Sequence, residues 1–316
     1  MKDNPLCTII VPTVGRPKYI GAALASVAAQ TYRPLEILVS DNAPNPSVEI
    51  GEIQRQSQEA KVRLIRPLPS LLEPARHFNL CVKEAQGEYV FIMGDDDLMS
   101  PGYIAASMEC ILGEPSVNAV IARQTRIGES FFGPVSNAPI HFKTLTGDEF
   151  LSQWLIEGKL PDVLTTFPMV ARRRQVLECG GLPEYPDASH STNTLILQLC
   201  LGAKLGLLDG GYYYRVYSTS GGLGTPWRKL VAATQDYDRD LLVLHKKGRL
   251  EKKLFLAIVR GNTQLLISRW KQLYRRRPGF ENKVRPVLDI VFRIFNLGWR
   301  HGLGAVPKLH KYFSSE

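Results

Sequence analysis

The chain has 316 residues, of which 44% are hydrophobic and 22% charged, a composition typical of a globular protein with a substantial core. The formal net charge of +9 suits anionic partners such as phosphates, nucleotides, nucleic acid or acidic lipid, and does not choose among them. The sequence contains no apolar run of about 20 residues and no signal-peptide core, so a spanning helix and a leader are not expected. The five cysteines show no CxxC or Cys/His spacing, which argues against a zinc site or a disulfide framework and favours a cytoplasmic protein with reduced thiols.

Strands and helices alternate over roughly the first 120 residues of the chain. Short β-rich runs predict strands at 8–12, 35–40, 62–66, 89–93 and 117–122. Helical spacing of apolar residues predicts helices over 18–30 and from Pro74, because proline suits the first turn of a helix. Ser100 and Pro101 are expected to form the N-cap and first turn of another helix. This order predicts an α/β protein whose mostly parallel sheet carries helices on both faces.

The rest of the chain is less regular. Residues 194–203 predict a helix, and 211–224 predict a strand that runs into a glycine-rich loop. From 226 to 316 the pattern is helical and basic, with an apolar stripe at Leu288, Val291, Ile294 and Phe295. This helical extension has two interpretations: it packs within the protein or in a homodimer, or it contacts anionic lipid at the inner face of the membrane.

The ends of three predicted strands carry candidate ligand-binding residues: Pro12 and Thr13 after the first, Asp41 after the second, and Asp95, Asp96 and Asp97 after the fourth. In parallel sheets, ligands bind at the carboxyl ends of the strands. Carboxylate oxygens are hard ligands that suit Mg²⁺ or Mn²⁺, and such a metal would neutralise a nucleotide diphosphate. The alternative is that the aspartate triplet only stabilises the following helix, because negative charge is favourable near the amino-terminal end of a helix.

Three other polar residues near these strand ends have two interpretations each. Asp41 begins DNAPNP, where it either caps its own turn or accepts hydrogen bonds from a base or a ribose. Arg76 and Asn79 lie on the polar side of the helix before the triplet. Arginine suits a diphosphate or a base edge, and the alternative is a solvated helix face.

Two segments, TIIVPTVGRPKYIGAALASVAAQTYRPLEILVSDNAPN and EPARHFNLCVKEAQGEYVFIMGDDDLMSPG, together resemble glycosyltransferase family 2, which has the GT-A fold. The resemblance covers roughly residues 6–120, the nucleotide-sugar half, and leaves 121–225 as the acceptor half. It implies inverting transfer of a sugar from a UDP- or dTDP-sugar to a hydroxyl of a glycan, a lipid-linked acceptor or a small molecule, with Mg²⁺ or Mn²⁺.

The resemblance also implies roles for single residues. It gives donor-binding roles to Pro12, Thr13, Arg16, Asp41, Arg76, Asn79, Asp95 and Asp96. Among them, Asp41 and Arg76 match residues beside the base, and Asp96 matches the residue near the ribose. Asp97 matches the metal-binding aspartate.

The region before the acceptor helix departs from the family. The stretch GGLPEYP, residues 180–186, resembles the lead-in to a helix that in the family begins with an acidic pair and supplies the general base. Here Ser191 and Thr192 stand at that pair, and neither hydroxyl is a base at neutral pH. Asp187 and His190 are the nearest ionisable groups, so one of them is expected to be the base. The alternative is that both line an exposed loop.

A second departure concerns the metal. In YYYRVYSTSGG, Tyr217 stands where the family often has a histidine near the metal. A phenol is a poor ligand for Mg²⁺ or Mn²⁺ unless it is ionised, so the metal would depend mainly on Asp97, the diphosphate and water. Both departures leave open a degenerate transferase that binds a nucleotide sugar or a partner protein.

Two rival functions are less well supported by the sequence. A nucleic-acid binder would depend on charge alone, because no aromatic and basic pattern of a known module occurs, so nucleic acid is not an expected partner. A nucleotidyltransferase would need a glycine-rich loop after the first strand, and PTVGRPK has one glycine.

Overall fold

In a computed structural model of the chain, the residues described are 4–56, 60–160, 169–187, 190–217 and 226–276. They form two compact units. The first consists of Met1–Glu184 and Ser191–Thr219, and the second of Tyr185–His190 and Ser220–Glu316.

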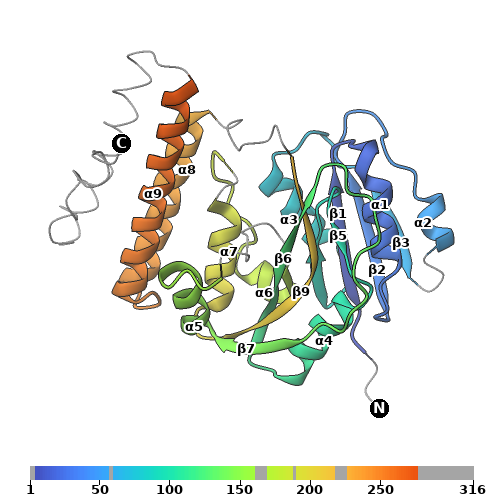
Figure 1. Cartoon of the computed structure of the whole chain (residues 1–316), viewed down its shortest axis with the longest axis horizontal. Coiled ribbons are helices and arrows are strands. Elements are labelled where there is room, and N and C mark those ends of the chain that lie inside the picture. The colour runs from blue at the N-terminus through green and yellow to red at the C-terminus, as the bar shows by residue number, and fades with distance from the viewer. Residues whose placement is uncertain (1–3, 57–59, 161–168, 188–189, 218–225, 277–316) are drawn as a thin grey trace. The chain divides into compact units, whose positions relative to one another are not determined.

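A nine-stranded sheet forms the centre of the first unit (Figure 1). Its strands are β1 (Cys7–Thr13), β2 (Leu35–Asp41), β3 (Lys61–Ile65), β4 (Tyr89–Ile92), β5 (Leu98–Met99), β6 (Val117–Gly128), β7 (Phe142–Thr146), β8 (Met169–Arg172) and β9 (Lys204–Val216). The order is β3-β2-β1-β4-β8-β6-β9-β5, with β7 paired to β9. Strands β3, β2, β1 and β4 run parallel to one another, as predicted. Strand β8 runs antiparallel to both of its neighbours, β4 and β6. The sheet is therefore parallel in its first half and mixed in its second.

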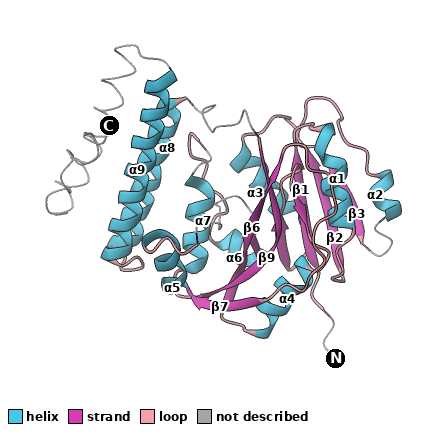
Figure 2. Cartoon of the chain, viewed as in Figure 1, coloured by secondary structure: helices cyan, strands magenta, loops and turns pink. Residues whose placement is uncertain are grey.

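Helices cover both faces of this sheet (Figure 2). They are α1 (Pro17–Ala28), α2 (Gly51–Gln56), α3 (Pro74–Glu84), α4 (Tyr103–Gly113), α5 (Gly147–Leu151), α6 (Arg173–Glu178) and α7 (Ser191–Cys200), with a π-helical turn at Ser152–Ile156. Successive side chains of a strand point to opposite faces, and Ile9 and Val11 of β1 share one core with Leu24 of α1 and Ile104 of α4. On the other face, α3 packs against β1 and α6 against β8. The predicted α/β class is confirmed.

The chain takes an unpredicted path between β4 and α4. Residues Leu98 and Met99 form the short strand β5, which pairs with β9. Helix α4 then begins at Tyr103, with Gly102 at its N-cap position and no capping side chain. The predicted N-cap at Ser100 and Pro101 is wrong, because the Ser100 hydroxyl donates instead to the carbonyl of Ser136 at 2.6 Å.

The second unit is helical, as the basic pattern predicted. It contains α8 (Trp227–Lys246) and α9 (Lys252–Arg276), with a small apolar core at Leu230, Val231, Leu266 and Ile267. Within the described part of the chain, none of the helices has the length and apolarity needed to cross a membrane. The stripe from Leu288 to Phe295 and the predicted boundary at 225 lie outside the described residues. The domain limits, the membrane contact and the dimer therefore stay predictions.

A close backbone approach at Gly87 aligns β4 with β1. A Cβ atom at Gly87 would lie 2.7 Å from the Thr8 backbone nitrogen and 2.6 Å from the Tyr89 carbonyl oxygen. The Gly87 N–H donates to the Thr8 hydroxyl at 2.8 Å, and that hydroxyl donates to the buried Glu36 carboxylate at 2.6 Å. Because the aspartate triplet follows β4, this contact helps to fix the triplet beside the end of β1.

We expect Gly87→Ala to lower the free energy of unfolding by about 2 kcal/mol or more, because the added methyl group displaces backbone atoms. Gly21→Ala is a matched control on the exposed side of α1, where a Cβ meets nothing within 4 Å. That change should stabilise the protein by about 0.5–1 kcal/mol. Urea unfolding of both variants measures the difference, and equal effects would contradict the role of Gly87.

Candidate functional site

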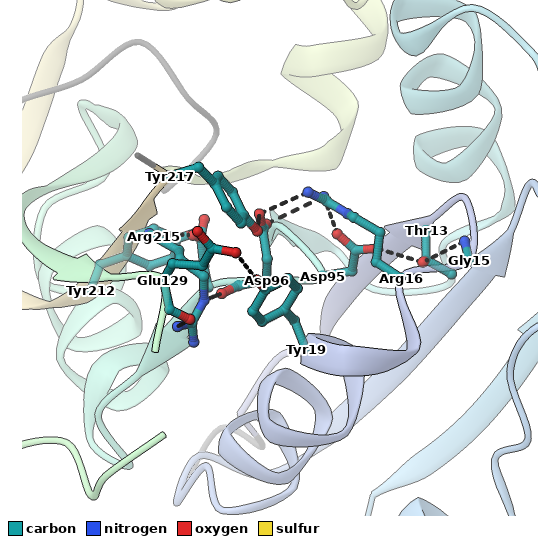
Figure 3. Close-up of polar contacts among 11 residues, drawn as sticks. Thr13, Gly15, Arg16, Tyr19, Asp95, Asp96, Glu129, Tyr212, Arg215 and Tyr217 are labelled. Carbon is teal, nitrogen blue, oxygen red and sulfur yellow. Dashed lines mark hydrogen bonds and ion pairs between the residues drawn. The ribbon is translucent and has the colours of Figure 1, made fainter. Parts of the chain in front are cut away.

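The end of β1 meets the first residue of the acidic triplet. Because β1 and β4 are adjacent parallel strands, Thr13 and Asp95 leave the sheet at the same edge. The Thr13 hydroxyl donates to Asp95 Oδ2 at 2.5 Å, and it accepts a hydrogen bond from the Gly15 N–H at 3.2 Å. Gly15 has a φ of +86°, a left-handed conformation that glycine adopts without strain. This turn directs Arg16 back toward the triplet (Figure 3).

Arg16 forms ion pairs with two aspartates of the triplet. Its guanidinium contacts the Asp95 carboxylate, and its Nη1 lies 2.8 Å from Asp96 Oδ2. Burial acts against the charge, but the hydrogen bond and charge of Asp95, together with Asp96, raise the pKa of Arg16. The Arg16 side chain is 44% exposed, whereas Asp95 is 1% exposed. A partly exposed cation thus neutralises carboxylates that would otherwise repel each other.

Asp97, like Asp95, is buried in the protein. Its Oδ2 accepts a hydrogen bond from the Tyr212 hydroxyl at 2.7 Å, and its Oδ1 accepts one from the Arg215 backbone N–H at 2.9 Å. Burial, together with the charge of Asp96, raises the pKa of Asp97 to about 7. Burial also raises the pKa of Asp95. Asp96, with a side chain that is 12% exposed, is therefore the most accessible carboxylate of the three.

Tyr217 contacts the same carboxylate as Arg16. Its hydroxyl donates to Asp96 Oδ2 at 2.5 Å. Burial, and then the contact with Asp96, raise the pKa of Tyr217, so the phenol stays protonated and acts as a hydrogen-bond donor. This is consistent with the expectation that Tyr217 is a poor metal ligand.

Arg215 joins the acidic turn to the loop after β6. Its side chain is 1% exposed, and its Nε donates to the Asp96 backbone carbonyl at 2.7 Å. Its Nη1 donates to the carbonyls of Gly128, Glu129 and Phe131 at 3.0, 3.1 and 2.8 Å. Neither Arg215 nor Tyr212 was expected at the site from the sequence. The available signal was a single arginine inside the apolar and aromatic run YYYRVY.

Asp41 caps its own turn. It pairs in register with Thr13, so it lies at the same edge of the sheet. Its carboxylate accepts hydrogen bonds from the Ser47 N–H and hydroxyl, both at 2.7 Å, and from the Ala43 N–H at 3.2 Å. Burial opposes ionisation, but these bonds, led by those from Ser47, lower the pKa of Asp41. The capping interpretation is thus observed, and the contact with a base stays a prediction, as does the donor role of Pro12 in β1.

Arg76 and Asn79 face a different loop from the one that contains the triplet. Arg76 Nη2 lies 3.0 Å from Glu184 Oε2, and both side chains are exposed. Asn79 Nδ2 donates to the Leu182 carbonyl, and the Leu182 N–H donates to Asn79 Oδ1, each at 2.8 Å. A groove of about 550 Å³ runs between α3 and this loop. Their predicted donor contacts therefore stay predictions.

The two candidate bases belong to the second unit and differ in accessibility. Asp187 is half-buried, whereas His190 is 1% exposed and stacks on Tyr237 with ring centroids 4.8 Å apart. His190 Nε2 lies 3.0 Å from the Thr234 hydroxyl, which itself donates to the Leu230 carbonyl at 2.8 Å. Since that hydroxyl has one hydrogen, Nε2 of His190 must be the donor. The structure therefore favours Asp187 over His190 as an accessible base.

Ser191 and Thr192 form the first turn of α7 and are buried. The Ser191 hydroxyl donates to the Pro183 carbonyl at 2.9 Å. This contact ties the start of the helix to the preceding loop, so Ser191 has a structural partner where the family resemblance expected an acid.

The carboxylates of the triplet are suitable ligands for a hard cation. The Arg16 guanidinium already provides one positive charge beside them. Among the residues that the structure describes, no three His, Cys, Asp or Glu side chains converge in a way that could hold a metal by themselves. Mg²⁺, however, is commonly bound by one or two carboxylates together with substrate phosphates. The residues present therefore fit a metal that arrives with a diphosphate.

In open α/β sheets, ligands bind at the carboxyl ends of the parallel strands, where this chain carries its polar and charged residues. The model of the family described as Glycosyl transferase family 2 matches residues 8–180, more than half of the chain. The chain belongs to this transferase family, and the resemblance noted in the sequence is confirmed.

Two curated relatives match only part of the chain. The uncharacterized glycosyltransferase EpsJ of Bacillus subtilis is 37% identical over 98 residues, which are 30% of this chain and 28% of EpsJ. The GalNAc(5)-diNAcBac-PP-undecaprenol beta-1,3-glucosyltransferase of Campylobacter jejuni is 26% identical over 105 residues, 33% of this chain and 34% of that protein. The matched segments thus span about a third or less of these relatives.

Solved structures share the fold at low sequence identity. Residues 1–349 of TarS from S. aureus, in complex with UDP-GlcNAc, give a TM-score of 0.61 at 17% identity, covering 91% of this chain and 79% of that one. The mannosyltransferase PcManGT from Pyrobaculum calidifontis, in complex with GDP-Man and Mn²⁺, gives 0.52 at 15% identity, covering 97% and 78%. These likenesses confirm the GT-A type of fold.

The raised pKa of Asp97 predicts a pH-dependent stability. Between its ordinary value of 3.8 and about 7, the folded chain holds a proton that the unfolded chain releases. The contribution of Asp97 to stability is therefore complete below pH 3.8 and is lost as the pH rises through about 7. In Asp97→Asn the amide cannot ionise, its oxygen still accepts from the Arg215 N–H, and its nitrogen donates to the Tyr212 oxygen.

We expect the melting temperature of Asp97→Asn to rise relative to wild type as the pH increases from about 5 to about 8. Thermal unfolding of both proteins in EDTA measures the difference at each pH. A difference that does not change with pH would contradict the assignment.

Proposed function

We propose that this protein is an inverting glycosyltransferase that uses a pyrimidine nucleotide-diphosphate sugar. The observation that carries the proposal is a cluster of contacts between two strand ends. Thr13 at the end of β1 and Arg16 just after it bind Asp95 and Asp96, which follow β4. Family membership and the UDP-GlcNAc complex of TarS support a nucleotide-sugar donor.

Arg16 is proposed to hold the donor diphosphate. Its partly exposed guanidinium can turn from Asp96 to phosphate oxygens, which it binds in a bidentate manner. Asp97 would hold Mg²⁺ or Mn²⁺ together with the diphosphate and water, and Asp96 would lie near the ribose. The metal, when bound, would neutralise charge on the leaving diphosphate. Asp41 is proposed to contact the base, with Arg76 and Asn79 nearby.

Asp187 is proposed as the general base that takes the proton from the acceptor hydroxyl. The hydroxyl then attacks the anomeric carbon from the face opposite the diphosphate, which inverts the configuration at that carbon. The support for Asp187 is its half-buried position, the burial of His190 and the absence of an acid at Ser191 and Thr192.

A degenerate transferase is the second candidate function. Ser191 has a structural hydrogen bond where a base is expected, and the Tyr217 hydroxyl donates to Asp96 where a metal ligand is expected. Such a protein would bind a nucleotide sugar or a partner without transferring the sugar. Donor binding without transfer to any acceptor in a cell extract would favour this function.

Calorimetric titration with UDP, dTDP and GDP, each with Mn²⁺ and then with excess EDTA, tests the donor site. We expect one pyrimidine diphosphate to bind in a metal-dependent manner. Arg16→Gln should weaken this binding about tenfold or more, because it removes a charge-assisted contact to the diphosphate. Arg174→Gln is a matched control, since Arg174 is 88% exposed and pairs with Glu178 on α6. If neither the nucleotides nor the full UDP-sugar binds, the proposal is wrong.

Asp187→Asn should lower kcat about 100-fold, the usual scale for loss of a general base. His190→Gln should lower the melting temperature, because the ring is buried against Tyr237, and it should leave kcat nearly unchanged. Release of UDP in the presence of donor and acceptor measures both rates. An unchanged rate in Asp187→Asn would place the base elsewhere.

A further inference from the structure

An exposed aromatic ring lies on the loop that Arg215 holds beside the acidic turn. Phe132 is 49% exposed and stacks on Tyr19, with ring centroids 5.9 Å apart and an interplanar angle of 7°. Tyr19 in turn contacts the Tyr217 ring edge-on at 5.6 Å, and the Tyr217 hydroxyl binds Asp96. Two ring contacts therefore connect Phe132 to the proposed donor site.

Arg215 fixes the position of Phe132. The Arg215 guanidinium lies over the rings of Tyr19 and Phe132 at 4.9 and 5.1 Å, in addition to its bonds to the loop carbonyls. Its Nη2 is buried and has no hydrogen-bond partner among the described residues. Burying such a group is costly, so the ring faces and the loop carbonyls must compensate together. The loop and its exposed ring are thus held by the same side chain that supports the acidic turn.

A carboxylate lies on the same loop. Glu129 Oε1 accepts a hydrogen bond from the Tyr19 hydroxyl at 3.2 Å and lies 3.5 Å from Lys18 Nζ. The Glu129 side chain is 41% exposed. Figure 3 shows Glu129 close to Tyr19 and Arg215, on the side of the acidic turn away from Thr13. The loop therefore presents an apolar ring and a hydrogen-bond acceptor together.

We infer that Phe132 and Glu129 form a subsite for a pyranose ring, which we assign to the sugar of the acceptor. A pyranose has an apolar C–H face that packs on an aromatic ring and hydroxyl groups at its rim that donate to a carboxylate. A single exposed phenylalanine is ordinary on a protein surface. This ring differs because a buried arginine fixes it beside a charged site. The inference rests on the proposed function, since it supplies the acceptor side of the same reaction.

Saturation-transfer NMR on the full chain, with UDP and Mn²⁺ present, tests the subsite. The probes are the methyl pyranosides of glucose, galactose, N-acetylglucosamine and N-acetylgalactosamine, and in a separate arm UDP-GlcNAc. We expect at least one pyranoside to receive saturation on its ring protons and to bind about tenfold more weakly to Phe132→Ala. Glu129→Gln should weaken binding of the same pyranoside, and Phe132→Tyr should leave that binding intact.

Phe142→Ala is the matched control. Phe142 is 38% exposed on β7 in the same unit, and its removal should leave pyranoside binding unchanged. Equal losses in Phe132→Ala and Phe142→Ala would overturn the inference, and so would pyranoside binding that does not depend on Phe132. If Phe132→Ala reduces saturation of the sugar protons of UDP-GlcNAc and leaves that of the pyranosides unchanged, the assignment to the acceptor is wrong. The ring would then contact the donor sugar.

The outcome is separable from that of the proposed function. UDP binding to Phe132→Ala, measured by calorimetry, should stay at the wild-type level, which also shows that the variant is folded. If the wild-type chain binds no nucleotide, the proposed function fails, whereas Phe132-dependent pyranoside binding in the same sample would still support the subsite.

Discussion

The mutual repulsion of three consecutive carboxylates is the constraint on which the rest of this structure depends. Asp95, Asp96 and Asp97 follow one another at the end of β4, and each is stabilised by a different set of groups. A threonine and a guanidinium contact the first, a guanidinium and a phenol contact the second, and a phenol and a backbone N–H contact the third. The compensating groups lie on β1 and β9 or just after them, so segments far apart in the sequence hold these charges together.

The half of the site that comes from β1 and β4 could be predicted from the sequence. Thr13 and the triplet each follow a predicted short apolar strand, and adjacent parallel strands end at one edge of a sheet. Arg16 was added by the family resemblance. Asp41 was also expected at that edge, but the direction of its carboxylate could not be predicted. That direction depends on Ser47, whose N–H and hydroxyl lie within its own loop.

The other half could not be predicted, because its residues are brought in by pairings between strands far apart in the sequence. Tyr212 and Arg215 contact Asp97 because the two-residue strand β5 pairs with β9. A strand of two residues has no recognisable periodicity. Because β5 could not be recognised, Ser100 and Pro101 were predicted to start a helix. Burial of His190 likewise depends on its contact with α8, which no local pattern indicates.

The short strand β5 has a mechanical consequence. The acidic turn is tied at one end to β4, in the parallel half of the sheet, and at the other to β9, in the mixed half. Asp95 is held by residues of the first half and Asp97 by residues of the second. Any sliding of one half against the other would change the separation of neighbouring carboxylates, and their charge density with it. The turn therefore links the geometry of two sets of strands to the electrostatic potential at a single point.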